Sequence, residues 1–152
     1  MVDMSHASEK SFYDALSISR APIVCSHSNC RALCDVPRNL TDDQLRAIAR
    51  KGGVVHITLY HGFLRTAGEA SILDAIAHLE HAISIMGTAH VGIGTDFDGD
   101  GGVSGMADSS ETINFTRMLL RRRYSPEDIA LIWGGNWLRV MDTVNGMAAT
   151  TA

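Results

Sequence analysis

The sequence predicts an α/β fold made of parallel β/α units. Apolar runs with strand character begin near residues 21, 53 and 90, and segments with helical periodicity lie between them. These starts are 32 and 37 residues apart, the length of one strand plus its crossover helix. Such units build an open doubly wound sheet or a (β/α)8 barrel, and the absence of G-x-G-x-x-G after the first strand disfavours dinucleotide binding.

Each expected element has a local signal. The expected strands are residues 2–4, 22–25, 53–59 and 91–94. The expected helices are residues 8–18, 41–50 and 71–86, followed, after a glycine-rich loop at 99–105, by a helical region that includes 133–144. Thr41 and Gln44 form a capping box, Ser71 opens the long helix, and Ser125 caps a helix with Pro126 at its first position.

The length of the chain does not suit a complete barrel. A (β/α)8 barrel needs about 250 residues, whereas this chain has 152. Half a barrel leaves two strand edges unpaired, which natural proteins avoid. We therefore expect residues 1–146 to form one half of a barrel, with a frayed tail at 147–152. The open edges should be covered by a missing amino-terminal half or by a second copy of the chain.

Composition excludes several classes of protein. A net charge of −4, with only one short basic run at residues 121–123, disfavours nucleic-acid binding. No apolar run reaches 18 residues and no charged apolar leader is present, so we expect no membrane segment in this chain. Cys25, Cys30 and Cys34 are odd in number and form no C-x-x-C pair. They are expected to fill the core, with a small zinc site that includes His27 as the alternative.

Three polar residues follow three different expected strands. His6 follows residues 2–4, His27 follows 23–25, and Asp96 follows 91–95. Because functional sites of parallel α/β folds lie at the carboxyl ends of strands, these side chains are expected to converge there. Imidazole binds zinc, so the sequence predicts a metal site, although a lone histidine at a strand end often serves as a cap or a core hydrogen-bonding group.

These residues belong to the stretches VDMSHAS, APIVCSHSNCRALCDVPRNLTDDQL, GGVVHITLYHGFL, HVGIGTDFDGD and GGNWLRV. Those stretches resemble the membrane dipeptidase (renal dipeptidase) family of zinc peptidases, and the likeness runs from residue 1 to about 144. The resemblance implies a (β/α)8 TIM-type barrel with two bridged zinc ions that hydrolyses dipeptides. Some members of the family also open β-lactam rings.

The resemblance also implies roles for four residues of this chain. His6 and His27 would be the histidine ligands of one zinc ion, Arg38 would bind the substrate carboxylate, and Asp96 would contact the substrate amine or transfer a proton. A guanidinium suits a carboxylate through paired hydrogen bonds, and two metal ions polarise a carbonyl and generate hydroxide. The chain departs from the family at His61, where members often have proline.

The resemblance covers the carboxyl-terminal half of the family only. The family's His-x-Asp pair for the other zinc, and the glutamate that bridges both ions, lie in the amino-terminal half. Since zinc sites usually have at least three protein ligands, His6 and His27 alone should hold zinc weakly, and the isolated chain should be inactive or nearly so. The alternatives are a non-catalytic fragment or subunit that needs an amino-terminal partner, and a different metal-dependent amidohydrolase barrel, which would lack Arg38.

Other motifs favour structural interpretations. Residues 96–101 mimic the start of a calcium loop, but Ala107 stands where an EF-hand needs glutamate. His56 and His90 are expected to be structural residues with satisfied hydrogen bonds. His78 and His81 lie three residues apart on a helix, and packing or surface polarity explains them better than a shared metal.

Overall fold

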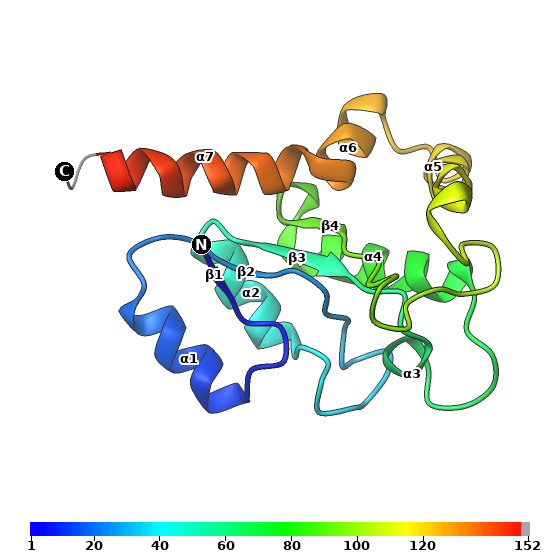
Figure 1. Ribbon diagram of the computed structural model, residues 1–152, viewed down its shortest axis with the longest axis horizontal. Helices are drawn as coiled ribbons and strands as arrows, with labels where there is room; N and C mark the ends of the chain where they lie inside the picture. Colours follow the sequence, from blue (N-terminus) through cyan, green and yellow to red (C-terminus); the bar gives the residue numbers. More distant parts are fainter. Residues whose placement is uncertain (150–152) are drawn as a thin grey trace.

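The computed structural model describes residues 1–149, and its centre is a parallel four-stranded sheet in the order β1-β2-β3-β4 (Figure 1). The strands are β1 (Val2–Asp3), β2 (Ile23–Cys25), β3 (Val54–Ile57) and β4 (Val91–Ile93). In the register, Val2 pairs with Ile23, Val24 with Val54 and Val55 with Val91. The prediction of parallel β/α units is confirmed.

Seven α-helices connect and follow the strands. They are α1 (Glu9–Ile18), α2 (Asp42–Arg50), α3 (His61–Leu64), α4 (Ile72–Met86), α5 (Thr112–Arg121), α6 (Pro126–Ala130) and α7 (Asn136–Ala149) among residues 1–149. The capping box predicted at Thr41 is present, and Ser71 forms a second one with Asp74. The Ser125 hydroxyl accepts a hydrogen bond from the Asp128 amide, as a helix cap does.

One face of the sheet packs against α1, α2 and α4. Because side chains alternate along a strand, Ile23, Cys25, Val55 and Ile57 point to the same face and join a large buried core. The helices contribute apolar residues at helical spacing, among them Phe12, Leu45, Ile48, Ile76 and Leu79. This core fixes the sheet, and with it the positions of the residues that follow each strand.

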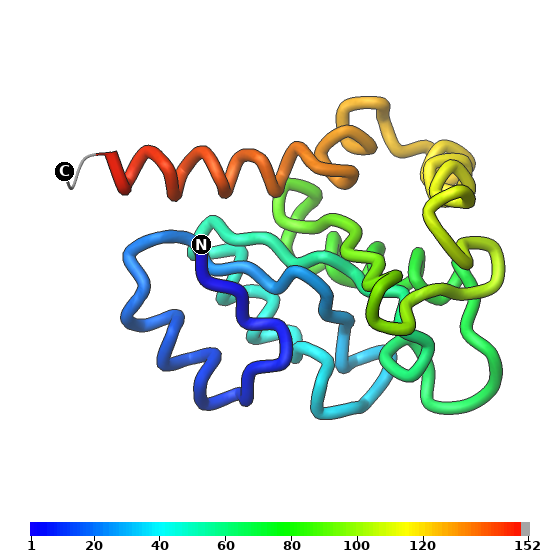
Figure 2. Tube along the Cα trace, in the orientation of Figure 1, coloured from blue at the N-terminus to red at the C-terminus, as the bar shows by residue number. Residues whose placement is uncertain are grey.

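The opposite face of the sheet packs against α7. Val24 and Val54 form a small separate cluster there with Val140, and Trp137 packs against it. The Asn136 side chain anchors the start of α7 by donating to the carbonyl of Val91, at the beginning of β4. The helix then extends past the amino-terminal ends of the strands, near the chain's own amino terminus (Figure 2).

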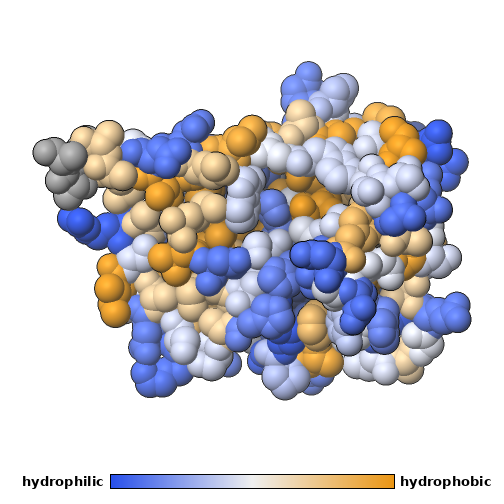
Figure 3. Space-filling view, in the orientation of Figure 1, coloured by the Kyte–Doolittle hydropathy of each residue, from blue (hydrophilic) through white to orange (hydrophobic). Residues whose placement is uncertain are grey.

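The sheet is open at both edges, as expected for half of a TIM-type barrel. β1 and β4 are its edge strands, and Val2 on β1 is 43% exposed. Apolar side chains gather between α7 and β1 in the space-filling view (Figure 3). The tail expected from residue 147 begins within α7, which continues through Ala149, and residues 150–152 lie outside the described part.

Within residues 1–149, every helix is too short or too polar to cross a membrane.

Candidate metal centre

Two histidines meet where β1 and β2 end. The Nε2 atoms of His6 and His27 are 2.8 Å apart, and their ring centroids are 4.9 Å apart. The pairing of β1 with β2 brings these side chains together across 21 residues of sequence. His6 has a φ of 68°, in the left-handed region that non-glycine residues rarely adopt. Its backbone is therefore held in an uncommon conformation next to His27.

Polar groups from the same strand ends hold His27. Its Nδ1 lies 2.8 Å from the Ser26 hydroxyl, which donates to the Asp3 carboxylate. Its backbone amide donates to the Ser5 hydroxyl at 3.1 Å. Sequence reasoning missed Asp3 and Ser26. The available signal was their position, since each is a polar residue at the end of a strand that leads to a histidine.

Arg38 lies against the same loop. Its two terminal nitrogens donate to the Ser28 hydroxyl and to the His27 carbonyl, each at 2.7 Å. The guanidinium carbon also lies 5.3 Å from the centre of the Phe63 ring, a cation–π contact. The Arg38 Nε is buried and has no hydrogen-bond acceptor in the described part of the chain, residues 1–149. An unpaired buried donor is costly, and the Arg38 side chain also lines a neighbouring cavity.

Asp96 follows β4, three strands away from His6. It has a φ of 61°, and its carbonyl accepts hydrogen bonds from Gly99 and Gly101, which close a tight turn. Among the described residues, no hydrogen bond joins its side chain to either histidine. The charge of Asp96 nevertheless affects the pKa of His6. Burial lowers the pKa of His6, as do the positive charges of Arg38 and His27, while Asp96 and Asp3 act in the opposite direction.

The two imidazoles supply part of a metal shell. In residues 1–149, no group of three or more His, Cys, Asp or Glu residues is arranged to hold a metal ion. Tetrahedral zinc with bonds of about 2.0–2.1 Å separates two nitrogen ligands by about 3.4 Å. The Nε2 atoms of His6 and His27, at 2.8 Å, would therefore part by several tenths of an ångström. Exposed imidazole nitrogens that already converge fit zinc, and further ligands are required.

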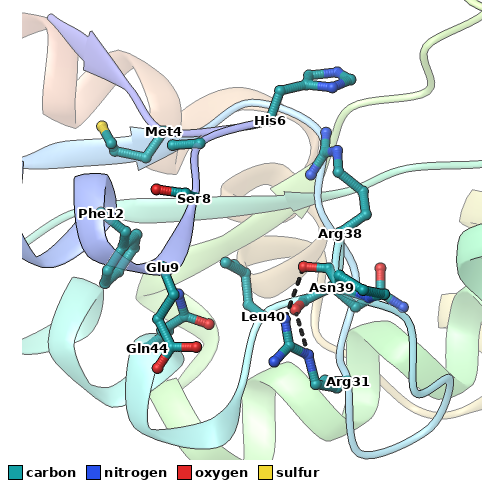
Figure 4. A pocket seen from close by; sticks show the side chains of 12 residues that line it. Met4, His6, Ser8, Glu9, Phe12, Arg31, Arg38, Asn39, Leu40 and Gln44 are labelled. Atoms are coloured by element: carbon teal, nitrogen blue, oxygen red, sulfur yellow. Dashed lines mark hydrogen bonds between the residues drawn. The ribbon is translucent and has the colours of Figure 1, made fainter.

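A cavity of about 300 Å³ opens beside this centre. His6 and Arg38 lie at one end of it, while Glu9 and Gln44 lie near the other (Figure 4). Its size reaches the lower limit of typical small-molecule pockets. The centre thus has a neighbouring space that is lined by both charged and apolar side chains.

The alternative zinc site in the cysteine segment is not assembled. Cys25, Cys30 and Cys34 are free and buried. Burial raises the pKa of Cys25 and that of Cys30 to about 12, which disfavours the thiolate form. Within residues 1–149, no cysteine joins a group of three or more His, Cys, Asp or Glu residues placed to hold a metal ion. The prediction that the cysteines fill the core is confirmed.

Three of the remaining histidines have structural partners. His78 accepts from the Cys30 amide and faces the Leu64 carbonyl, while His81 pairs with Asp42 at 2.8 Å. His90 faces the Gly53 carbonyl.

The expectation of a satisfied role is wrong for His56. Its buried Nε2 has no hydrogen-bond partner among residues 1–149, and the ring packs against Trp137 and over Gly92.

The fold and the position of the site place the chain in the class of TIM-barrel-type α/β domains, of which it contains four strands. Within this class the chain belongs to the membrane dipeptidase family, peptidase family M19, whose family model matches residues 1–152.

Its relatives by sequence include several dipeptidases. An uncharacterised dipeptidase of Schizosaccharomyces pombe is 39% identical over 92% of this chain and 35% of its own length. Dipeptidase 3 of Homo sapiens is 35% identical over 95% of this chain and 30% of its own length. An uncharacterised protein of Klebsiella pneumoniae is 38% identical over 94% of this chain and 54% of its own length. The chain thus spans about a third to a half of these relatives.

The solved structures that the chain matches also include dipeptidases. The probable dipeptidase PvdM of Pseudomonas aeruginosa superposes with a TM-score of 0.93, with 29% identity over 95% of this chain and 50% of that one. A metallopeptidase of Rhodobacter sphaeroides, liganded with a phosphinate mimic of L-Ala-D-Ala, has a TM-score of 0.89 and 33% identity over 94% of this chain and 42% of that one. The prediction of half a dipeptidase-type barrel fold is confirmed.

Proposed function

We propose that this chain supplies the carboxyl-terminal half of the catalytic domain of a zinc-dependent dipeptidase. The observation that carries the proposal is the convergence of the His6 and His27 Nε2 atoms, 2.8 Å apart, at the carboxyl edge of two adjacent parallel strands. Membership of the membrane dipeptidase family supports it. The dipeptide mimic bound to the Rhodobacter sphaeroides neighbour indicates the substrate class.

His6 and His27 would hold one zinc ion through their Nε2 atoms. When bound, zinc acts as a Lewis acid on a carbonyl and lowers the pKa of coordinated water towards neutrality. The family uses two bridged ions, so the bridging glutamate and the ligands of the second ion would come from the other half of the barrel. The lack of a third metal-binding residue near the pair, within residues 1–149, agrees with this division of the ligands.

Arg38 and Asp96 would orient the dipeptide. Arg38 lines the cavity beside the two histidines, and its remaining guanidinium hydrogens suit the substrate's terminal carboxylate. The bonds from Arg38 to Ser28 and to the His27 carbonyl hold the guanidinium beside the metal pair. The Asp96 carboxylate would contact the substrate amine or carry a proton, since it follows the fourth strand at the same edge of the sheet.

The proposal is tested with purified chain, zinc and L-Ala-D-Ala. The chain alone should show less than about 1% of the turnover of a complete relative, because the metal shell is incomplete. Adding the part of the Rhodobacter sphaeroides metallopeptidase that this chain does not match should strengthen the weak zinc binding of the chain and produce turnover. Arg38→Met should then weaken binding of the phosphinate mimic more than it weakens binding of zinc.

A matched control is His61→Gln, which replaces an exposed histidine outside the pair. It should leave zinc binding and turnover unchanged, whereas His27→Gln should abolish both. Full turnover by the isolated chain would contradict the division of the site. Zinc binding that survives loss of His6 and His27 would contradict the metal role.

A second candidate is a non-catalytic subunit that only completes a barrel. The open edge at β1 and the incomplete metal shell favour it. It predicts that the reassembled protein binds zinc and folds but hydrolyses no dipeptide. The same complementation experiment therefore separates the two functions.

A further inference from the structure

A chain of three side chains leads from the end of β1 to the ring of His27. The Asp3 Oδ2 accepts a hydrogen bond from the Ser26 hydroxyl at 2.5 Å, and the same hydroxyl oxygen lies 2.8 Å from His27 Nδ1. The other oxygen, Oδ1, accepts from the backbone amides of Ser5 and Ser26, each at 3.0 Å. Four hydrogen bonds thus connect two adjacent strand ends to one imidazole.

The protons in this network can be assigned by counting donors. An ionised carboxylate only accepts hydrogen bonds, so the single hydroxyl hydrogen of Ser26 must point to Asp3. The Ser26 oxygen can then only accept from the His27 ring, which places the ring hydrogen on Nδ1. In the neutral ring, Nε2 consequently carries no hydrogen, and its lone pair faces His6.

The ionised state of Asp3 follows from its partners. Burial alone would raise the pKa of this carboxyl, but the hydrogen bonds from Ser26 and Ser5 outweigh burial and lower the pKa below its ordinary value. Asp3 is therefore a carboxylate at neutral pH.

We propose that Asp3 and Ser26 are positioning residues that lock His27 in the Nδ1–H tautomer, with its Nε2 lone pair directed at the metal position. The metal role of His27 rests on the proposed function, whereas the tautomer does not. Neither residue touches a substrate or a metal in this arrangement. They act through the ring of His27, as the hydrogen-bond partners of metal-binding histidines commonly do.

The two histidines are held unequally. His6 must donate its Nε2 hydrogen to His27, because the bare Nε2 of His27 can only accept. Its other nitrogen, Nδ1, has no hydrogen-bond partner among residues 1–149. His27 is thus prepared to bind a metal, while His6 must first release its Nε2 hydrogen.

The tautomer is measurable by NMR without any metal. In chain labelled with ¹⁵N in its imidazole rings, at pH 8, the nitrogen shifts distinguish Nδ1–H from Nε2–H. The signals of His27 are assigned by their disappearance in His27→Gln. In the unsubstituted chain His27 should be predominantly Nδ1–H.

Asp3→Asn makes the sharpest test because it reverses the hydrogen-bond direction with little change in shape. The asparagine oxygen can still accept from the Ser5 and Ser26 amides, which leaves its amide group to donate to the Ser26 hydroxyl oxygen. The hydroxyl hydrogen must then point to His27, so the ring should switch to Nε2–H. Ser26→Ala should remove the preference, and Ser26→Thr should restore it.

The matched control is Ser5→Ala. Ser5→Ala keeps the backbone amide that donates to Asp3 and removes a hydroxyl that contacts Asp3, Ser28 and the His27 backbone, but not the His27 ring. Because the Ser26 bonds to Asp3 and to the ring remain, the tautomer should stay unchanged. Circular dichroism establishes that each variant is folded. Zinc titrations followed by the same histidine signals should show affinity that is about 10- to 100-fold weaker in Asp3→Asn and Ser26→Ala. Ser26→Thr and Ser5→Ala should stay within about threefold of the unsubstituted chain.

The outcomes separate this inference from the proposed function. An Nε2–H tautomer in the unsubstituted chain, or no change in Asp3→Asn, overturns the inference even if zinc binds at the pair. A tautomer that switches as expected supports it, and if zinc then binds without involving His6 and His27, the proposed metal role fails instead.

Discussion

Asn29 and Thr58 are joined by two reciprocal hydrogen bonds just beyond the ends of β2 and β3. The Asn29 side chain accepts from the Thr58 amide at 3.0 Å and donates to the Thr58 carbonyl at 3.1 Å. Both residues are fully buried. The side chain thus replaces a strand partner for Thr58 and holds the segment that carries His27 against β3.

Asn29→Ala should destabilise the chain by about 2–4 kcal/mol, because it leaves a buried amide and a buried carbonyl without partners. Urea unfolding measures this loss as a lower midpoint with an unchanged slope. Asn145→Ala, on the exposed surface of α7, is the matched control and should change the free energy of unfolding by less than about 0.5 kcal/mol. Equal effects of the two substitutions would contradict the proposed importance of the Asn29 pair.

Gly94→Ala should be destabilising because there is no room for its methyl group. A Cβ at this position would lie 1.8 Å from the backbone carbonyl oxygen of Ser26. That atom belongs to the main chain, so the segments that follow β2 and β4 would have to move apart, at a cost of about 1–3 kcal/mol or more. Thermal unfolding would show a lower Tm.

The control is a glycine with free space around it. Gly146 lies in α7, and among residues 1–149 nothing outside its own helix lies within 4 Å of its Cβ position. Gly146→Ala should leave stability unchanged or raise it by about 0.5–1 kcal/mol, since alanine favours helix. If Gly94→Ala were equally well tolerated, the close approach of Ser26 to β4 would be wrong.

Stability should fall as the pH drops below about 6.5. Burial lowers the pKa of His56 from its ordinary value of 6.5 to about 4, and burial also lowers the pKa of His78. Between pH 6.5 and about pH 4, His56 is protonated in the unfolded chain but not in the folded chain. The free energy of unfolding therefore decreases as the pH falls through this range. For His56 alone the decrease amounts to about 3 kcal/mol.

Urea unfolding at pH 7.5, 6.0, 5.0 and 4.5 measures this dependence. His56→Phe keeps a ring against Trp137 but removes the titrating group, so its stability should decline less over this range. His61→Gln, which replaces an exposed histidine, should follow the unsubstituted chain. A His56→Phe profile that matches the unsubstituted chain at every pH would count against a buried neutral His56.

Zinc should stabilise the chain through the histidine pair, and a chelator should reverse the effect. At a zinc concentration ten times Kd, mass action adds about 1.4 kcal/mol, or about 3–5 °C in Tm for a chain of this size. His27→Gln should remove the rise, because one imidazole alone binds zinc poorly. A rise of the same size in that variant would place the zinc elsewhere.

The order of the elements could be predicted from the sequence because its signals are local. The box at Thr41 begins α2 and that at Ser71 begins α4. Apolar runs at regular separation indicated parallel units, and the polar residues after those runs indicated the carboxyl edge. His6 and His27 became candidates in this way, since each comes within three residues of the end of its strand.

The connections between side chains could not be predicted in the same way. The hydrogen bond from Ser26 to Asp3 joins residues 23 positions apart, and that from Arg38 to the His27 carbonyl joins residues 11 positions apart. The unpaired nitrogen of His56 is a result of how the ring is packed. No local pattern specifies the direction of a hydrogen bond between two strand ends.

For this protein, the sequence by itself determined the parallel architecture, the capped starts of α2 and α4, and the choice of His6 and His27 as candidate ligands, whereas the last helix, expected at 133–144, is α7 at Asn136–Ala149. Spacing, periodicity and capping residues act within one or two turns of the chain and are readable without a fold. Only the tertiary structure decided that Asp3 and Ser26 direct the ring of His27, and that α7 covers the second face of the sheet. Those arrangements depend on strand register and on competition among polar groups for partners, which exist only once the chain is folded.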